Sequence, residues 1–264
     1  MTAAPAGTVV DLDVSAYALR LGDDALVLGQ QLCRWAARSP SVEEDVALLN
    51  LALDLLGQAR SLLTRAGELE GRGRDEDQLA FLRDEPEWTC ALLFELDGGD
   101  FGRTTARQLL VSAYAVPLWQ ELARSADEVL AGVAGKAVKE AAYHLDHART
   151  WMVRLGDGTA ESHRRAQAGL DEVWPYAAEL FERDALVDRL VARGVAADPD
   201  RLRPAWEAVV REVLAEATLE VPQAGDGPGD GGPTGGRSGR HLAGFGDLLA
   251  ELQQLPRAHP GATW

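Results

Sequence analysis

Polar side chains stand at helical spacing at two places in the sequence, and one of these places includes a histidine. Asp54 and Gln58 are four residues apart, and Glu140, Tyr143 and His144 follow one another closely further along the chain. Residues three or four apart share one face of an α-helix. In di-iron proteins built as helical bundles, each of two helices carries a Glu-x-x-His pair that projects inward. The two clusters are therefore candidates for a metal site.

The histidines do not complete this pattern. None of the five stands three residues after an aspartate or a glutamate. The motif places an imidazole three residues after the acidic residue. Gly57 stands at that position after Asp54, and Tyr143 stands there after Glu140. His144 comes one residue late, which rotates it by about 100° around the helix. It can contact Glu140 but is poorly aimed at a shared metal. The spacing favours a hydrogen-bond network over a metal site at these positions.

Charged residues elsewhere extend the candidate set. Lys136 and Lys139, the only lysines of the chain, lie one helical turn from Glu140. They can neutralise carboxylates that a metal would otherwise balance. An active di-iron oxidase stays open as an alternative, in which carboxylates replace two imidazoles. Its non-standard ligands would be Asp24, Asp54, Glu121, Glu140 and His144.

The elements that must position these residues are helices, because apolar residues recur at steps of three and four along almost the whole chain. No stretch alternates with the period of a strand, so we expect almost no β-structure. Pro117 should kink one long helix. The expected helices span about residues 17–35, 41–67, 101–124, 125–155, 159–173, 176–193 and 200–218, with shorter pieces between 75 and 95.

The helix at about 41–67 is apolar on two faces. Such a helix is buried by more than one neighbour, so we expect it in the centre of a bundle. Ser41 and Glu44 fit a capping box at its start. Ser125 and Glu128 fit a second capping box at the start of the helix expected at about 125–155. The two apolar seams consist of Leu48, Leu55 and Leu62, and of Val46, Leu49, Leu53, Leu56 and Leu63.

The C-terminal part of the chain has a different composition. Residues 221–239 are nearly all Gly, Pro, Asp and Ser, which predicts a flexible loop that buries no apolar area. Residues 241–255 then predict a short amphipathic helix that docks back. The sequence thus indicates a single all-α domain over residues 1–264, a helical bundle with additional C-terminal helices.

The composition excludes several classes of protein. The chain of 264 residues carries 26 Lys+Arg against 42 Asp+Glu, a net charge of −16, which speaks against nucleic-acid binding. We find no apolar run of the length that a membrane span needs, and no secretory signal, so we expect a cytoplasmic protein that does not bind membranes. The two cysteines cannot form a disulfide framework.

Several strings resemble the C subunit of the bacterial phenylacetyl-CoA epoxidases. The resemblance covers about residues 15–220 and resumes at about 235–255. Between residues 221 and 239 the loop is longer and looser than the family's usual connection. The matching strings are GDDAL at 22–26, EED at 43–45, NLALDLLGQAR at 50–60, DEDQLAFLRD at 75–84, KE at 139–140 with YHL at 143–145, RLGDGT at 154–159, ESHRR at 161–165 and EATL at 216–219.

The resemblance implies a ferritin-like fold and a place in an oxygenase of several subunits. Enzymes of this family epoxidise the aromatic ring of phenylacetyl-CoA with O₂ and electrons from NADPH. In them the di-iron centre and the CoA-ester pocket belong to a similar A subunit, and the C subunit is its metal-free structural partner. We therefore expect no cofactor in this chain, a di-iron centre in its partner and a hetero-oligomer. A free-standing helical adaptor is a further alternative.

Overall fold

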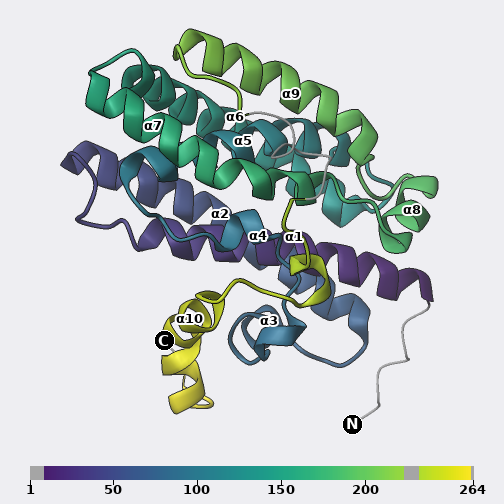
Figure 1. Cartoon of the computed structure of the whole chain (residues 1–264). Helices are drawn as coiled ribbons and strands as arrows, with labels where there is room; N and C mark the ends of the chain where they lie inside the picture. The colour runs from purple at the N-terminus through teal and green to yellow at the C-terminus, as the bar shows by residue number, and fades with distance from the viewer. Residues whose placement is uncertain (1–8, 223–231, 263–264) are drawn as a thin grey trace.

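The computed structural model describes residues 9–222 and 232–262, and this part of the chain is helical without a strand (Figure 1). The all-α prediction is confirmed. The α-helices are α1 (Val9–Cys33), α2 (Val42–Glu70), α3 (Glu76–Phe81), α4 (Leu92–Glu95), α5 (Phe101–Leu122), α6 (Glu128–Gly156), α7 (Ala160–Val173), α8 (Ala185–Ala192), α9 (Pro199–Glu216) and α10 (Phe245–Ala258). Three 3₁₀-helices accompany them: η1 (Glu85–Glu87), η2 (Trp174–Phe181) and η3 (Gly236–Ser238).

The four long helices form the bundle. Helix α1 packs along α2, α5 packs along α6, and α2 contacts α6 across the middle. Helices α7 and α9 cover α5, and α10 lies apart from the bundle on α3 (Figure 1). This arrangement agrees with a ferritin-like fold, in which paired long helices enclose the core.

Helices α1 and α2 come unusually close. A Cβ on Gly22 would lie 2.9 Å from Cδ2 of Leu63, so glycine is what permits this approach. The seam of Leu48, Leu55 and Leu62 is buried as predicted. Of the second seam only Leu63 is buried, since Val46 is 54% and Leu53 64% exposed. Helix α2 is thus buried by two neighbours, α1 and α6, as expected, but most of its second seam is not covered.

Helix α2 is also long and apolar enough to cross a membrane by length and composition. This differs from the expectation from the sequence that the chain contains no such run. The criterion is weak here, because core helices of soluble proteins also meet it, and the buried side of α2 packs on α1 and α6.

The ends of the helices correct several sequence predictions. Ser41 caps α2 by accepting from the Glu44 backbone N–H at 3.3 Å. Helix α6 begins two residues later than its predicted capping box, because the Asp127 carboxylate accepts from two backbone N–H groups and forms the cap. Ser125 instead donates to the carbonyl of Val195 at 2.7 Å.

The chain from 176 to 193 is not one helix. It divides into η2 and α8, because Asp184 accepts from the backbone N–H of Val187 at 2.9 Å and starts a new helix there. Pro117 lies inside α5 as expected. The C-terminal helix begins at Phe245, four residues later than predicted.

The Gly-rich segment is partly ordered. Of the predicted loop, residues 223–231 lie outside the described residues, but within 232–239 Gly235 and Gly236 are buried. A Cβ on Gly236 would lie 2.1 Å from the carbonyl oxygen of Cys90. The small residues that suggested a loop therefore serve a close backbone approach as well.

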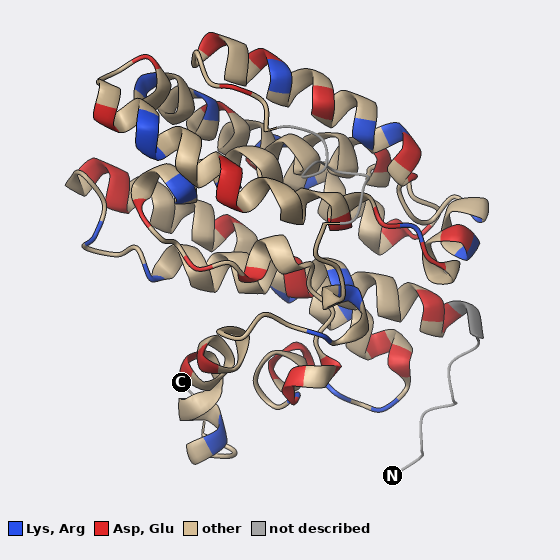
Figure 2. Cartoon of the chain, viewed as in Figure 1, with Lys and Arg blue, Asp and Glu red and all other residues tan. Residues whose placement is uncertain are grey.

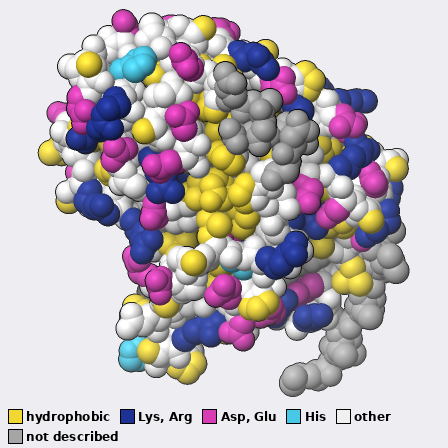
Figure 3. Space-filling view, in the orientation of Figure 1, with side chains coloured by type: hydrophobic (Ala, Val, Ile, Leu, Met, Phe, Trp, Pro, Cys, Tyr) yellow, Lys and Arg dark blue, Asp and Glu magenta, His cyan; other side chains and the backbone are white. Residues whose placement is uncertain are grey.

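Acidic and basic residues alternate over the helices and loops (Figure 2). On the face drawn in Figure 3, apolar side chains gather near the middle and charged side chains surround them. This mixing of signs lets many acidic residues form ion pairs despite the net charge of −16.

Candidate functional site

The line where α2 meets α6 holds four of the predicted site residues, which we call the polar seam. Gln58 Nε2 donates to Glu140 Oε2 at 2.8 Å. His144 Nε2 lies 3.1 Å from Asp54 Oδ2. Each pair joins a residue of α2 to one of α6, so the seam fixes how these two helices lie against each other. The spacing of four on each helix is what puts the pairs on facing sides.

The charge of Glu140 in the polar seam is compensated within the chain. Lys136 Nζ lies 3.0 Å from Glu140 Oε1, as the sequence predicted. Lys139 is exposed and pairs with no acidic group in the described residues. Burial lowers the pKa of His144, and the neighbouring Asp54 opposes this shift only in part. The imidazole is therefore neutral at physiological pH and acts as a hydrogen-bond donor to the carboxylate.

The remaining predicted residues do not join the polar seam. Tyr143, expected in the core, is 54% exposed because its position on α6 points away from the bundle. Asp24 lies on the α4 side of α1, where Ala91 N donates to it at 2.9 Å. Glu121 lies at the end of α5 and accepts from Asp198 N at 3.4 Å. Four of the seven candidates thus form the polar seam, and the other three lie at three other places.

These positions do not fit the usual di-iron ligand set. Gly57 has no side chain where an imidazole is needed, and a Cβ there would meet only Lys136 Nζ, at 3.9 Å. Tyr143 is exposed to solvent. The non-standard set with Asp24 and Glu121 is not supported either, because those carboxylates face other elements.

A second contact joins the start of α2 to the C-terminal part of α6. Glu44 accepts from Trp151 Nε1 at 2.7 Å and lies 2.8 Å from His147 Nε2. Glu44 is only 5% exposed. Sequence reasoning assigned its side chain to a capping box, since Ser41 stands three residues before it. The contact between Trp151 and Glu44 could not be predicted from the sequence, because the two residues are 107 positions apart.

A segment that the sequence analysis missed fastens the C-terminal part to the bundle. We call residues 235–242 the C-terminal strap. Arg237 donates from both terminal nitrogens to the two carboxylate oxygens of Asp24, each at 2.8 Å. Glu179 of η2 accepts from the backbone N–H of Gly235 at 2.8 Å. The strap thus bridges carboxylates that come from α1 and η2.

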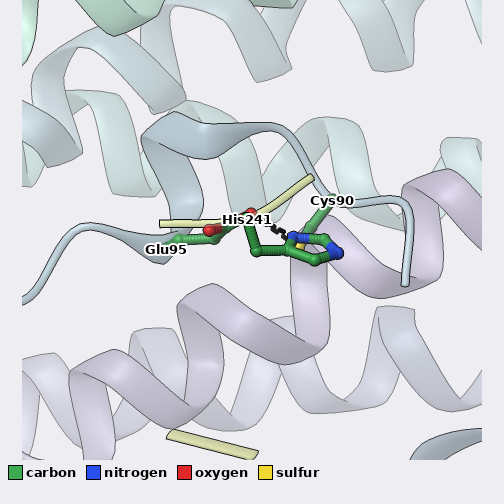
Figure 4. Close-up of side chains that lie close together, drawn as sticks. All are labelled: Cys90, Glu95 and His241. Carbon is green, nitrogen blue, oxygen red and sulfur yellow. Dashed lines mark hydrogen bonds and ion pairs between the residues drawn. The ribbon is translucent and has the colours of Figure 1, made fainter. Parts of the chain in front are cut away.

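The far end of the strap carries a cluster of Cys90, Glu95 and His241, whose potential ligand atoms all lie within 4.8 Å of one another (Figure 4). His241 Nδ1 lies 2.7 Å from Glu95 Oε1, and the thiol of Cys90 contacts the same oxygen at 3.5 Å. Leu242 N donates to Glu95 Oε2 at 2.8 Å. Glu95 is thus already shared among three protein donors.

The protonation of this cluster follows from burial and charge. Burial raises the pKa of the Cys90 thiol well above its ordinary value, so it stays protonated. Burial opposes a charged His241, but the hydrogen bond to Glu95 and the negative charges of Glu95 and Glu85 together outweigh it and raise the pKa of the imidazole. The thiol and the imidazole both contact Glu95, and these contacts hold the end of the strap on the bundle.

A buried ion pair completes the polar interior beside the strap. Arg83 and Asp23 are 1% and 0% exposed and form a bidentate pair. Thr89 N donates to the same carboxylate at 2.8 Å, and the guanidinium lies 4.2 Å from the ring of Trp88. These contacts hold the loop between α3 and α4 on α1. The adjacent acidic residues at 23 and 24 therefore serve two different arginines.

Comparison with known proteins agrees with the matching strings in the sequence. A family model described as phenylacetic acid catabolic protein matches residues 5–264. The C subunit of 1,2-phenylacetyl-CoA epoxidase from Escherichia coli strain K12 is 46% identical over 251 residues, which are 95% of this chain and 99% of that protein. The resemblance to the epoxidase C subunits is confirmed. The chain belongs to the phenylacetic acid catabolic protein family.

Proposed function

We propose that this chain is the structural, non-catalytic subunit of a multi-subunit phenylacetyl-CoA epoxidase of aerobic phenylacetate catabolism, and that it is itself metal-free. It would support a catalytic partner that carries the di-iron centre, in the cytoplasm. The observation that carries the proposal is the missing acidic-x-x-His pattern, with Gly57 at one of the two positions where an imidazole would stand.

The contacts of the polar seam support this proposal. Both oxygens of Glu140 already have partners, Oε2 the amide of Gln58 and Oε1 the ammonium of Lys136. Asp54 has the imidazole of His144. A cation would have to displace these groups and compete with a lysine charge at the same carboxylate. Lysine and glutamine here contact a carboxylate of the kind that metal ions bind in di-iron proteins of such folds.

The structural role follows from what the seam does. Metal ligands must be held within about 0.5 Å of their productive geometry, which requires supporting elements that do not move. The pairs between α2 and α6 lock two long helices together. A rigid helical surface of this kind can hold the ligand-bearing helices of a neighbouring subunit at fixed spacing.

Metal analysis of separated subunits tests the proposal. We expect the epoxidase complex to contain iron and this chain, purified alone from iron-supplemented cells, to contain none. Glu140→Gln should leave the iron content of the complex unchanged. Stoichiometric iron in this chain alone, lost in Glu140→Ala, would contradict the proposal and favour the di-iron oxidase. Failure to co-purify with any epoxidase subunit would favour a free-standing adaptor.

A further inference from the structure

One face of α2 has no partner within the described part of the chain. Nine large apolar side chains are clearly exposed in residues 9–222 and 232–262, and five of them lie on α2 and α6. On α2 they are Val42, Val46 and Leu53, at 74%, 54% and 64% exposure. We call Val42, Val46, Leu49, Leu53 and Leu56 the outer stripe. Leu49 and Leu56 are half-buried along its edge.

The spacing of the outer stripe is that of a helix-packing seam. Its residues follow one another at steps of four, three, four and three. This is the heptad spacing with which one helix packs against another. From Val42 to Leu56 the stripe runs about 21 Å, at 1.5 Å per residue. Because no helix of the described chain covers it, the pattern points to a helix from another molecule.

Neighbouring residues widen the same face. Leu53 lies one position before Asp54, which contacts His144 of α6, and Tyr143 precedes that histidine. Tyr143 is 54% exposed, and its aromatic ring extends the apolar surface from α2 onto α6. Tyrosine is among the side chains enriched at protein interfaces. Val129, 39% exposed, lies at the start of α6.

Gly57 is an independent sign of a close neighbour. It lies in the interior of α2, where glycine is less favourable than alanine. It is exposed, and a Cβ would meet only Lys136 Nζ, at 3.9 Å. Nothing within the described chain therefore requires glycine at this position. A backbone that approaches from outside would require it.

We infer that the outer stripe, with Tyr143 and Gly57, is the surface on which a helix of another epoxidase subunit docks. The inference rests on the proposed function, and on the relative of 46% identity being named as one subunit of an epoxidase. A second copy of this chain is disfavoured as occupant, because each copy carries a net charge of −16. The same charge disfavours an anionic membrane surface.

Co-purification from cells that express all the epoxidase subunits tests the inference. With the tag on this chain, Leu53→Glu should lower the recovery of its partner at least about tenfold, because it places a charge in an apolar contact. Leu82→Glu is the matched control, since Leu82 is 52% exposed after α3, away from the stripe. It should leave recovery unchanged. Both variants should melt like the unmodified chain.

Gly57→Ala separates a docking role from a structural one. In the isolated chain it should raise the melting temperature, because alanine favours the helix and meets no clash. In the complex it should lower partner recovery. A variant that stabilises the chain and leaves recovery intact would contradict the close approach at this residue.

The outcomes distinguish the docking role of the outer stripe from the proposed function of the chain. Normal partner recovery with Leu53→Glu would overturn the face and leave the proposed function standing. No recovery of any epoxidase subunit by the unmodified chain would overturn both. A homodimer of the isolated chain that Leu53→Glu dissociates, measured by sedimentation, would assign the stripe to a second copy instead. Flotation with phosphatidylcholine vesicles that the same variant abolishes would assign it to a membrane.

Discussion

The bidentate contact of Arg237 with Asp24 should be the strongest single fastening of the C-terminal strap. Both groups are largely buried, with side-chain exposures of 14% and 8%. Removing one partner of a buried pair costs about 3–5 kcal/mol, because the other charge is left without compensation. At about 2–4 °C per kcal/mol for a chain of this size, Arg237→Met should lower the melting temperature by about 6–20 °C.

The pH dependence of this loss has a definite sign. Burial raises the pKa of Asp24 to about 6, and Arg237 counteracts that rise. The native chain therefore binds more protons than the unfolded chain between about pH 4 and 6, and this carboxyl favours folding less as pH rises through that window. Without Arg237 its pKa rises further. The deficit of Arg237→Met should then be larger at pH 7.5 than at pH 5.

Thermal unfolding followed by circular dichroism at both pH values measures the effect. Arg164→Met is the control, because Arg164 forms an exposed pair with Glu161 one helical turn away. It should leave the melting temperature almost unchanged. A deficit for Arg237→Met that equals the control, or that grows as pH falls, would refute the reasoning. Asp24→Asn combined with Arg237→Met should recover part of the loss, since it removes the uncompensated charge.

Three further results are expected from other buried contacts. Trp151→Phe should cost about 1–3 kcal/mol in urea unfolding, because it removes the donor to the buried carboxylate of Glu44; a neutral result would contradict that contact. Gly236→Ala should release the strap to limited proteolysis, since a Cβ would lie 2.1 Å from the carbonyl of Cys90, and unchanged cleavage would argue against this packing. In the folded chain an aromatic disulfide reagent should label Cys33 before Cys90, because Cys90 is fully buried and Cys33 is not. Equal rates before unfolding would contradict the burial of Cys90.

Periodicity predicted the helices well but not what covers them. The two seams of α2 look alike in sequence, since both repeat leucine at helical steps. Only the fold shows that Leu48 and Leu55 meet the bundle and that Leu53 does not. Which side of an apolar helix stays open depends on the number of neighbours, and local sequence does not encode that number.

The candidate site was predicted in part. The pairing of Asp54 with His144 and of Gln58 with Glu140 follows from spacing once the two helices are antiparallel. Asp24 was assigned to the same interior, because a helical position alone does not say which of several neighbours it faces. Its true partner, Arg237, is 213 residues away in a segment whose glycines predicted only a loop.

The separation between Asp24 and Arg237 also sets an order of events during synthesis. At about 5–20 residues per second, a ribosome needs roughly 10–40 s to reach Arg237 after it has added Asp24. Until the strap is made, the carboxylates of Asp24, Glu95 and Glu179 have none of their strap contacts. Water must supply the hydrogen bonds that the strap later provides. The interior beneath α4 therefore closes after translation of the strap, and until then this side of the protein is the one that chaperones and proteases meet.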